Sequence, residues 1–440
     1  MDDHARYIGR TAKSGELFKR ASKVLVGGTT RTSVYFPPYP AFMAKGEGCR
    51  TVDVDGNAYI DFINNYTTLI HGHGFAPVVE AVRQQAGQGL CFGAPSEHEI
   101  RLAELIVGRV ASIEKLRFAS SGTEAVMYAL RLARLFTGRN TVAKFEGGFH
   151  GAYDDCQVSY KLTAEHIAEA ADPVTILNSA GLEAGVGDRV VVLPFNQIDA
   201  ACAAIDAQAD DLACVIVEPV IGAGGVIPAD RKFLEALRER TAHHGILLIF
   251  DEIMSLRLGY GGAQQGYGIT PDLTTLGKII SGGLPLAAFG GREEVMAPLD
   301  PTTGPPPIPQ SGTFNGCATA AAAGTACMEH LTREALSHLD ALGQDLKHGL
   351  EQLFRRTATE AQVTGFGSLF NIHFSAAPVE DHRGAARADQ ARVERFFQAL
   401  LLRGQCIAPR GMICLSTVMG KAEIDGFIDA VADALASGEV

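Results

Sequence analysis

Two apolar runs on either side of an amphipathic segment constrain the fold of this chain most strongly. The runs are "ACVIVEPV" (213–220) and "GILLIFDEI" (245–253), and "DRKFLEALRERTAHHG" (230–245) lies between them with helical spacing and a terminal glycine. Strand, helix and strand at this spacing predict a right-handed crossover between two parallel strands. Ligands of such sheets gather at the carboxyl ends of the strands. Glu218 and Asp251 lie at those ends, so we expect the functional site there.

The rest of the chain indicates an α/β protein with more than one domain. Segment 41–62 alternates between apolar and polar residues and turns at "DGN" (55–57), which predicts a β-hairpin. From about residue 95, helical segments alternate with short apolar strands. At 440 residues the chain exceeds the size of a single hydrophobic core. The proline-rich segment 298–310 is a candidate domain border or surface excursion.

Composition and charge disfavour several classes of protein. A formal net charge of −12 argues against a nucleic-acid partner, and no run of apolar residues is long enough to predict a membrane span. The first residues are polar and lack an apolar signal core, and the nine cysteines are scattered without a CxxC pair. These features predict a cytoplasmic protein with reduced thiols. No metal site is expected, because the two histidines of "HGHG" (71–74) have no evident third ligand nearby.

Two glycine-containing motifs predict places for a phosphate and for a flat ring. "SSGTEA" (120–125) comes directly before a strong helical segment. Its residues Ser121, Gly122 and Thr123 would offer amides and hydroxyls to an anion, although the motif alone also fits a plain helix N-cap. Phe149, in the glycine-rich turn of "EGGFHGAYDD", could stack on an aromatic ligand or simply pack within its loop.

Asp251 and Lys278 complete the pattern. Asp251 follows the apolar run "GILLIF", and a carboxylate at that depth needs a cationic partner. Lys278 stands alone in the apolar and glycine-rich "DLTTLGKIISGGLP", where a lysine either extends to water or is needed for its amine. Together the four features match pyridoxal phosphate, whose pyridine nitrogen needs a carboxylate and whose aldehyde needs a lysine. A lysine that only extends to water would leave Asp251 unexplained.

The order of these motifs resembles the class III aminotransferases of pyridoxal-phosphate fold type I. Within that family the chain is most similar to the branch with glutamate-1-semialdehyde aminomutase and the β-amino acid aminotransferases. The motifs are "SSGTEA", "FHG", "VEPV", "LLIFDEI", "TTLGKIISGGLP" and "SGTFNG", and the resemblance extends from "GGTTRTS" to "RGMICLS".

The resemblance implies an α/β fold with two domains. A large cofactor-binding domain with a mainly parallel sheet would span 60–315. A smaller α+β domain would combine 1–59 with 316–440. The resemblance also implies a homodimer in which the subunits share their active sites.

The resemblance implies catalytic and phosphate-binding roles for five residues. Lys278 would be the Schiff-base amine, and Asp251 would be the partner of the pyridine nitrogen. The phosphate would lie in a cup formed by Ser121, Gly122 and Thr123.

Further cofactor contacts are implied around the ring. Phe149 would stack on one face, at a position that is usually tyrosine in relatives, and Ile253 would back the other face. Glu218 would lie near the cofactor, and Thr313 of "SGTF" would reach the phosphate bound by the partner subunit. The segment "DEIMSLRL" lacks the Gly-Phe that commonly precedes its arginine, so we assign Arg257 no ligand.

Two arginines and a tyrosine are candidates for substrate binding. Arg410 in "APRGMICLS" stands where the aminomutase branch has a glutamate, and Arg31 in "GGTTRTSVYF" lies in a segment similar to the carboxylate-binding loop of β-phenylalanine aminotransferases. A planar guanidinium binds a carboxylate bidentately, although an arginine taken at random more often forms a surface salt bridge. Tyr66 in "DFINNYTT" could wall the substrate pocket or simply pack.

These residues predict an aminotransferase with a ping-pong mechanism. It would move the amino group of a β-amino acid, such as β-phenylalanine, to 2-oxoglutarate or pyruvate, with Lys278 as the proton carrier. A D-arylglycine-type transaminase and a glutamate-1-semialdehyde-like aminomutase remain open alternatives. A non-catalytic cofactor-binding regulator is disfavoured, because the acidic chain has no room for a DNA-reading domain.

Overall fold

A seven-stranded sheet forms the centre of the larger part of the molecule. The computed structural model of the chain describes residues 3–169 and 173–440. Strand β12 is antiparallel to both of its neighbours, and the other adjacent strands pair in parallel. In spatial order the strands are β4 (Lys115–Ala119), β12 (Ala287–Gly291), β11 (Leu273–Leu276), β10 (Leu247–Asp251), β7 (Leu212–Val217), β5 (Thr141–Phe145) and β6 (Val190–Leu193).

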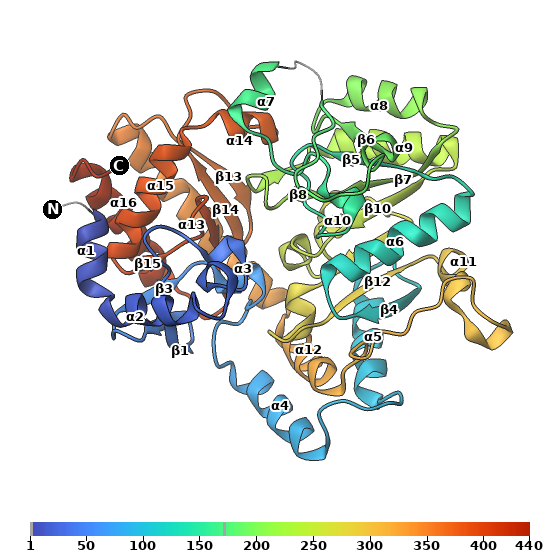
Figure 1. The fold of residues 1–440 in the computed structure, drawn as a ribbon, viewed down its shortest axis with the longest axis horizontal. Helices are drawn as coiled ribbons and strands as arrows, with labels where there is room; N and C mark the ends of the chain where they lie inside the picture. The colour runs from blue at the N-terminus through green and yellow to red at the C-terminus, as the bar shows by residue number, and fades with distance from the viewer. Residues whose placement is uncertain (1–2, 170–172) are drawn as a thin grey trace.

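The predicted crossover is confirmed. Strands β7 and β10 are parallel neighbours, and helix α9 (Arg231–His244) connects them and ends at Gly245 in the left-handed conformation. Both faces of the sheet are covered by helices (Figure 1). Ile249 of β10 packs in the cluster with α6 (Gly122–Thr137), whereas Leu248 and Phe250 pack with α9 and α8 (Ile198–Ala207). The strand side chains therefore alternate between two apolar layers, as an α/β fold requires.

The smaller part of the molecule joins the two ends of the sequence. The predicted hairpin is confirmed: β2 (Arg50–Asp53) and β3 (Ala58–Asp61) are antiparallel, and Gly56 between them has a φ of 92°. A short β15 (Gln405–Cys406) pairs in parallel with β3, so N-terminal and C-terminal segments lie together (Figure 1). The other strands here are β1 (Met43–Glu47), β13 (Gln362–Phe366), β14 (Leu369–His373) and β16 (Met412–Cys414).

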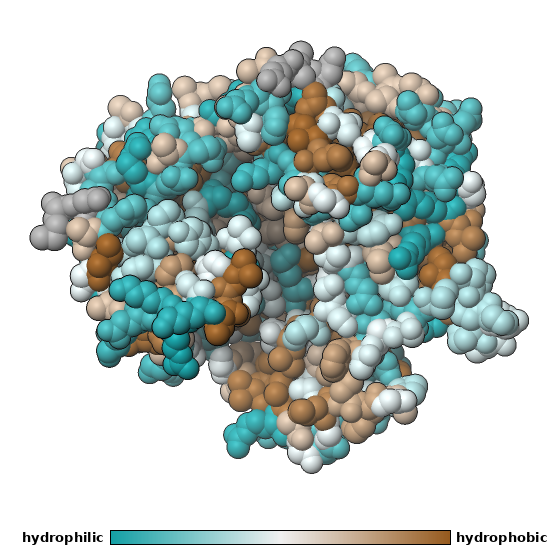
Figure 2. Space-filling model, in the orientation of Figure 1, coloured by the Kyte–Doolittle hydropathy of each residue, from teal (hydrophilic) through white to brown (hydrophobic). Residues whose placement is uncertain are grey.

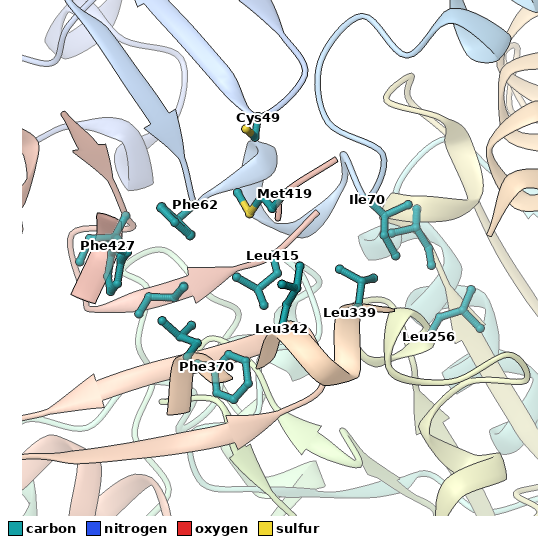
Figure 3. Packing of buried hydrophobic residues seen from close by; sticks show 14 of the residues in the cluster. Cys49, Phe62, Ile70, Leu256, Leu339, Leu342, Phe370, Leu415, Met419 and Phe427 are labelled. Carbon is teal, nitrogen blue, oxygen red and sulfur yellow. The ribbon is translucent and has the colours of Figure 1, made fainter. Parts of the chain in front are cut away.

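An apolar core holds this smaller part together. Figure 3 shows Phe62, Phe370, Leu342 and Phe427 converging from segments that are far apart in the sequence. The rings of Phe62 and Phe427 are 4.7 Å apart between centroids. Burial of each such side chain stabilises the fold by roughly 1.5–3 kcal/mol. The helices around this core are α1 (Asp3–Arg10), α2 (Ala12–Ala21), α13 (Arg333–Arg356), α15 (Gln390–Leu402) and α16 (Lys421–Ala436).

The remaining helices lie in several places in Figure 1, with α4 at the lower edge, α7 and α14 at the top and α11 at the right. They are α3 (Asn64–Thr67), α4 (Ala76–Gln88), α5 (Glu97–Arg109), α7 (Ala164–Glu169), α10 (Ala263–Tyr267), α11 (Glu293–Met296), α12 (Ala318–His330) and α14 (His382–Arg387). Segment 298–310 is largely exposed. The predicted border between residues 59 and 60 falls inside β3, and the division into domains stays a prediction. Over the described residues, none of the helices combines the length and the apolar character needed to cross a bilayer.

Candidate active site

Three strand ends and one helix start converge at the site. Glu218 follows β7, Asp251 ends β10, Lys278 follows β11, and Ser121 caps α6. Parallel strands put their carboxyl ends on one edge of the sheet, which explains why residues so far apart in sequence meet here. The amine of Lys278 interacts electrostatically with both Asp251 and Glu218. The expectation that the two carboxylates mark the strand ends is confirmed.

Asp251 is buried and held on both oxygens. Its Oδ1 accepts hydrogen bonds from Thr275 Oγ1 and from the Ile253 amide, each at 3.1 Å, and its Oδ2 lies 2.8 Å from Nδ1 of His150. Burial lowers the pKa of His150, and the contact with Asp251 opposes that shift. Among the described residues, no group pairs with the other ring nitrogen of His150, Nε2. The sequence analysis missed the pairing of His150 with Asp251.

Lys278 occupies a strained backbone position next to these carboxylates. Its φ is 52°, in the left-handed region that costs a non-glycine residue roughly 1–3 kcal/mol. Its carbonyl accepts a hydrogen bond from Ser281 Oγ at 2.7 Å. Burial lowers the pKa of the Lys278 amine, and Asp251 and Glu218 partly oppose this shift. A neutral amine is therefore easier to reach here than on a surface lysine.

Glu218 connects this cluster to the turn of Phe149. Its Oε2 accepts a hydrogen bond from the Phe149 amide at 2.9 Å, and its Oε1 accepts one from the Gly222 amide at 3.1 Å. Burial and the charge of Asp251 raise the pKa of Glu218 to about 8. The Phe149 ring is 42% exposed and meets Tyr160 edge-on at 5.4 Å, so its predicted stacking on a cofactor stays a prediction.

The start of α6 has the features of an anion site. Ser121 caps the helix by accepting from the Glu124 amide at 3.2 Å, and Thr123 Oγ1 accepts from the Ala152 amide at 3.0 Å. The first amides of a helix have no partner within the helix and favour anions. The plain N-cap is therefore present, and the role of the same motif as a phosphate cup stays a prediction.

Glycines keep space open over Ile253. A Cβ atom on Gly122 would lie 2.7 Å from Cδ1 of Ile253, and one on Gly277 would lie 3.3 Å from its Cγ2. Ile253 is thus enclosed between the start of α6 and the Lys278 loop. This arrangement, with the unpaired His150 nitrogen, the amine and the helix start, fits a ligand that has a phosphate, an aromatic ring and a carbonyl group.

Asn315 ties the "SGTF" loop to the start of α6, a contact that sequence reasoning missed. Its Oδ1 accepts from Ser120 Oγ at 2.9 Å, and its Nδ2 donates to Glu124 Oε1 at 3.1 Å. The only hint of this contact in the sequence was that Asn315 lies two residues after Thr313. Thr313 itself is exposed, and its contact with a partner subunit stays a prediction.

Tyr66 brings the two candidate substrate arginines together. The guanidinium carbons of Arg410 and Arg31 lie 5.5 and 5.7 Å from the centroid of its ring. Arg31 donates to Asn65 Oδ1 at 3.1 Å, whereas Arg410 Nη2 reaches only Met412 Sδ, at 3.4 Å, among the residues that the structure describes. Across the described chain, Arg410 Nε has no hydrogen-bond partner. Burial lowers the pKa of Arg410, and Tyr66 and Glu218 oppose this shift.

Arg257 supports the turn that carries Tyr66. Asn64, Asn65, Tyr66 and Thr67 have φ values of 49°, 48°, 54° and 78°, so the whole turn is strained. The buried guanidinium of Arg257 donates to Thr67 O at 2.9 Å. It also bonds Ser368 Oγ at 2.8 Å and the carbonyl of Leu415. Arg257, to which we assigned no ligand, therefore stabilises this turn.

A cavity of about 590 Å³ lies beside Tyr66 and Arg31 and is lined by N-terminal and C-terminal segments of the smaller part. Figure 2 shows a hollow between the two parts of the molecule. Its wall is mostly apolar and includes Phe36, Phe42, Phe397, Leu401 and Ile407. Lys278 does not line it. The cavity therefore adjoins Arg31 and Tyr66 rather than the amine.

This fold and this set of side chains define a pyridoxal 5′-phosphate-dependent enzyme of fold type I. The chain belongs to the class-III aminotransferase family, whose model matches residues 33–435. It is 40% identical to glutamate-1-semialdehyde 2,1-aminomutase of Methanothermobacter thermautotrophicus over 426 residues, which cover 96% of this chain and 99% of that protein.

Two solved structures show the same fold. An omega-transaminase from Sphaerobacter thermophilus has a TM-score of 0.92 at 46% identity, with 96% of this chain and 97% of that chain covered. A β-phenylalanine aminotransferase from Variovorax paradoxus has a TM-score of 0.91 at 35% identity, with 99% and 96% covered. The chain is therefore similar both to aminomutases and to transaminases, and the reaction has to be argued from the site.

Proposed function

We propose that this enzyme moves the amino group of a β-amino acid, such as β-phenylalanine, to 2-oxoglutarate or pyruvate. The observation that carries the proposal is the half-buried guanidinium of Arg410, which lies over the ring of Tyr66. Within the described residues its buried Nε has no hydrogen-bond partner, and it forms no salt bridge with a carboxylate. A buried cation without a partner is costly unless a ligand supplies the anion. A substrate carboxylate would be that anion, because it accepts two parallel hydrogen bonds from one guanidinium.

Arg31 gives the site a second cation on the same aromatic ring. An aminotransferase must bind an amino acid in one half-reaction and a 2-oxo acid in the other. With two arginines, the site could bind carboxylates at two different positions. The apolar cavity beside Tyr66 offers room for a phenyl or alkyl side chain of the donor. The similarity to the β-phenylalanine aminotransferase from Variovorax paradoxus supports the same donor class.

The residues around Lys278 would hold the cofactor as follows. Ser121, Gly122 and Thr123 would bind the phosphate at the start of α6, and Thr313 of the partner subunit would add to it. Asp251 would keep a proton on the pyridine nitrogen. At the start of α6 the phosphate would accept hydrogen bonds from backbone amides that have no partner within the helix and from side-chain hydroxyls.

Side chains on both ring faces would then fix the orientation. Ile253 would lie under one face, in the space that Gly122 and Gly277 leave open, and Phe149 would cover the other. Glu218, whose raised pKa keeps it largely protonated near neutral pH, would lie beside the ring without adding a full negative charge.

Lys278 would carry the proton in the reaction. When bound, the cofactor supplies an aldehyde that takes up the amino group and a protonated ring that withdraws electrons from the reacting carbon. Burial lowers the pKa of the Lys278 amine and so favours its neutral form. This amine would remove a proton from that carbon and return it in the reverse half-reaction. Arg410 holds the substrate carboxylate so that the carbon stays within reach of the amine.

An aminomutase acting on a semialdehyde is the second candidate. It is favoured by the 40% identity to glutamate-1-semialdehyde 2,1-aminomutase over 96% of this chain. Such an enzyme retains the amino group on one substrate and needs no 2-oxo acid acceptor. Arg410 speaks against it, because a cation replaces the glutamate expected at that position.

The deciding experiment separates the two half-reactions. Visible absorbance of the cofactor-loaded protein is followed while β-phenylalanine or β-aminobutyrate is added alone, and then 2-oxoglutarate. Loss of the band with the donor and recovery with the acceptor supports the proposal. Loss only with an α-arylglycine supports a D-arylglycine-type transaminase. Turnover of glutamate-1-semialdehyde without an acceptor supports the aminomutase.

We also propose that the enzyme acts as a homodimer. Apolar side chains are unusually exposed around α4 and α5, among them Leu90 (64%), Phe314 (61%) and Ile100 (55%). Figure 2 shows apolar surface at the lower edge of the molecule, where α4 lies in Figure 1. Exposed apolar patches of this kind mark protein interfaces. Light scattering should give a dimer for the native chain, and Leu90→Glu should shift it toward monomer.

A further inference from the structure

The short helix α14 contacts two turns that lie beside the active site. Its N-cap is Asp381, which accepts a hydrogen bond from the Gly384 amide at 2.7 Å and so fixes the first turn of the helix. The first two helical residues, His382 and Arg383, are both buried. The helix belongs to the C-terminal segment, and both side chains bond to residues that come far earlier in the chain.

The ring of His382 bridges two of these earlier segments. Its Nε2 accepts a hydrogen bond from the Leu162 amide at 3.1 Å, so that nitrogen carries no proton. The proton therefore lies on Nδ1, which donates to the carbonyl of Gly224 at 2.9 Å. Burial lowers the pKa of His382, and the bond to Gly224 and the charge of Glu146 oppose this shift. One neutral tautomer of His382 thus satisfies both contacts.

The Gly224 carbonyl belongs to the turn that holds one side of Glu218. The Gly222 amide donates to Glu218 Oε1 at 3.1 Å. Within the turn, the amides of Gly225 and Val226 donate to the Gly222 carbonyl at 3.4 and 3.2 Å. Movement of the Gly224 carbonyl would therefore shift the amide that bonds Glu218.

Arg383 holds the start of the turn that carries Phe149. Its Nε and Nη2 donate to the two carboxylate oxygens of Glu146 at 2.7 and 3.0 Å, and this bidentate pair is buried. Glu146 directly follows β5. A Cβ atom on the next residue, Gly147, would lie 2.3 Å from Cβ of His382, so α14 packs directly on this backbone.

We propose that His382 and Arg383, together the α14 clamp, are positioning residues for the active site. They act by holding the two backbone amides that donate to Glu218. These amides belong to Phe149 and Gly222, and they lie 2.9 and 3.1 Å from the two different oxygens of that carboxyl group. Arg383 fixes the first amide and His382 the second, so the clamp fixes Glu218 from both sides.

The effect of the α14 clamp on the cofactor rests on the proposed function, in which Glu218 and Phe149 lie beside the cofactor ring. Without the clamp, both turns would move more freely and the cofactor would be released faster. The hold on the turns does not rest on that function, because every hydrogen bond involved is made within the chain. The test therefore has one measurement for the turns and another for the cofactor.

Hydrogen exchange of the full chain, with and without cofactor, measures the hold on the turns. Arg383→Lys keeps the charge and loses the bidentate bond, so exchange within 146–151 should become about tenfold or more faster. Strands β7 and β10 should exchange as in the native chain, because the sheet does not depend on the clamp. Arg387→Lys, at the exposed end of the same helix, should change neither region.

Two substitutions at His382 separate its contacts. His382→Asn places an amide donor near the position of Nδ1, so it should keep the Gly224 contact and speed exchange in peptides that contain Leu162. His382→Gln places an acceptor near the position of Nε2, so it should keep the Leu162 contact and speed exchange within 222–226. These opposite patterns are not expected from a general loss of stability.

Release of cofactor from the loaded enzyme, followed by visible absorbance, is the second measurement. Arg383→Lys should release the cofactor about tenfold or more faster than the native enzyme, in line with the loss of one charged hydrogen bond. Faster exchange in the turns with an unchanged release rate would support the clamp and contradict the cofactor contacts proposed for Phe149 and Glu218.

Two outcomes would overturn the proposal. Unchanged exchange within both turns in all three variants would show that α14 does not hold them. Equal acceleration across the turns and strands β7 and β10 in all three variants would mean that His382 and Arg383 serve only the stability of the whole fold.

Discussion

The Nδ1 atom of His150 lies 2.8 Å from Oδ2 of Asp251, and both side chains are buried. Thr275 and the Ile253 amide satisfy the other oxygen of Asp251, so three groups fix this carboxylate at the end of β10. A hydrogen bond to a charged group contributes roughly 1.5–3 kcal/mol. His150 is therefore a positioning residue for Asp251.

Replacing His150 by phenylalanine should weaken the hold on Asp251. We expect kcat to fall about tenfold or more, in line with roughly 1.5–3 kcal/mol for one charged hydrogen bond. The pH profile of the visible absorbance should also shift, which a purely structural defect would not produce. His150→Asn, which keeps a donor, should recover part of both effects. An unchanged absorbance profile in His150→Phe would contradict this role.

Lys278→Ala should remove the proton carrier. We expect kcat to fall by roughly 10²–10⁴-fold or more, as for the loss of a general acid–base group. Borohydride reduction of the native enzyme should fix the cofactor covalently on the peptide that contains Lys278, and peptide mass mapping would detect it. Lys144→Met offers a control, because Lys144 is buried and donates to the Val158 carbonyl. Covalent label on another lysine would show that the assignment is wrong.

Arg410 should bind the substrate carboxylate as a fork. Arg410→Lys keeps the charge but loses the bidentate geometry, so we expect kcat/KM for the donor to fall about tenfold or more, from a loss of roughly 1.5–3 kcal/mol. Arg410→Met should lose more. Steady-state kinetics should compare the loss of kcat/KM for β-phenylalanine with the loss for the corresponding amine that lacks the carboxylate. Equal losses for both donors would mean that Arg410 does not contact the carboxylate.

Glu218 should make the stability of the cofactor-free protein depend on pH. Burial and Asp251 raise the pKa of Glu218 from 4.5 to about 8. Its contribution to the unfolding free energy is therefore full below pH 4.5 and is lost as the pH rises through about 8. Urea denaturation should show the native protein losing stability relative to Glu218→Gln across this window. Parallel pH profiles of the two proteins would refute the prediction.

Arg257 should control the turn of Tyr66 through its three hydrogen bonds. Arg257→Lys cannot reach all three acceptors, and each buried acceptor left without a donor costs about 1–3 kcal/mol of unfolding free energy. We also expect KM to rise more than kcat falls, because Tyr66 moves relative to Arg410. Arg101→Lys, at an exposed ion pair with Glu329, should change little. Unaltered KM in a destabilised Arg257→Lys would limit the role to folding.

Local patterns accounted for much of the fold. The crossover of β7, α9 and β10 and the hairpin of β2 and β3 were predictable, because apolar periodicity and turn residues act over a few neighbouring positions. The order of the glycine-rich and charged motifs likewise indicated the family and its cofactor. Glu218 and Asp251 could be placed at strand ends because parallel topology fixes where those ends lie.

Contacts between distant segments could not be predicted from the sequence. Nothing in "FHGAYDD" indicates that His150 pairs with Asp251, and nothing near "DEIMSLRL" indicates that Arg257 bonds the Thr67 carbonyl. The strained turn of Asn64–Thr67 is also invisible locally at its last two residues, since tyrosine and threonine ordinarily avoid a positive φ. Such a turn persists only where the surrounding structure holds it.

The sequence by itself determined the helices, the strands, the family and the cofactor, because short-range periodicity and ordered motifs encode them. The tertiary structure alone decided that Arg31 and Arg410 share Tyr66 and that His150 holds Asp251. Each of these contacts joins separate segments of the chain. Only the packing of the whole molecule brings those segments together, because no local rule relates the direction of one side chain to that of another so far away.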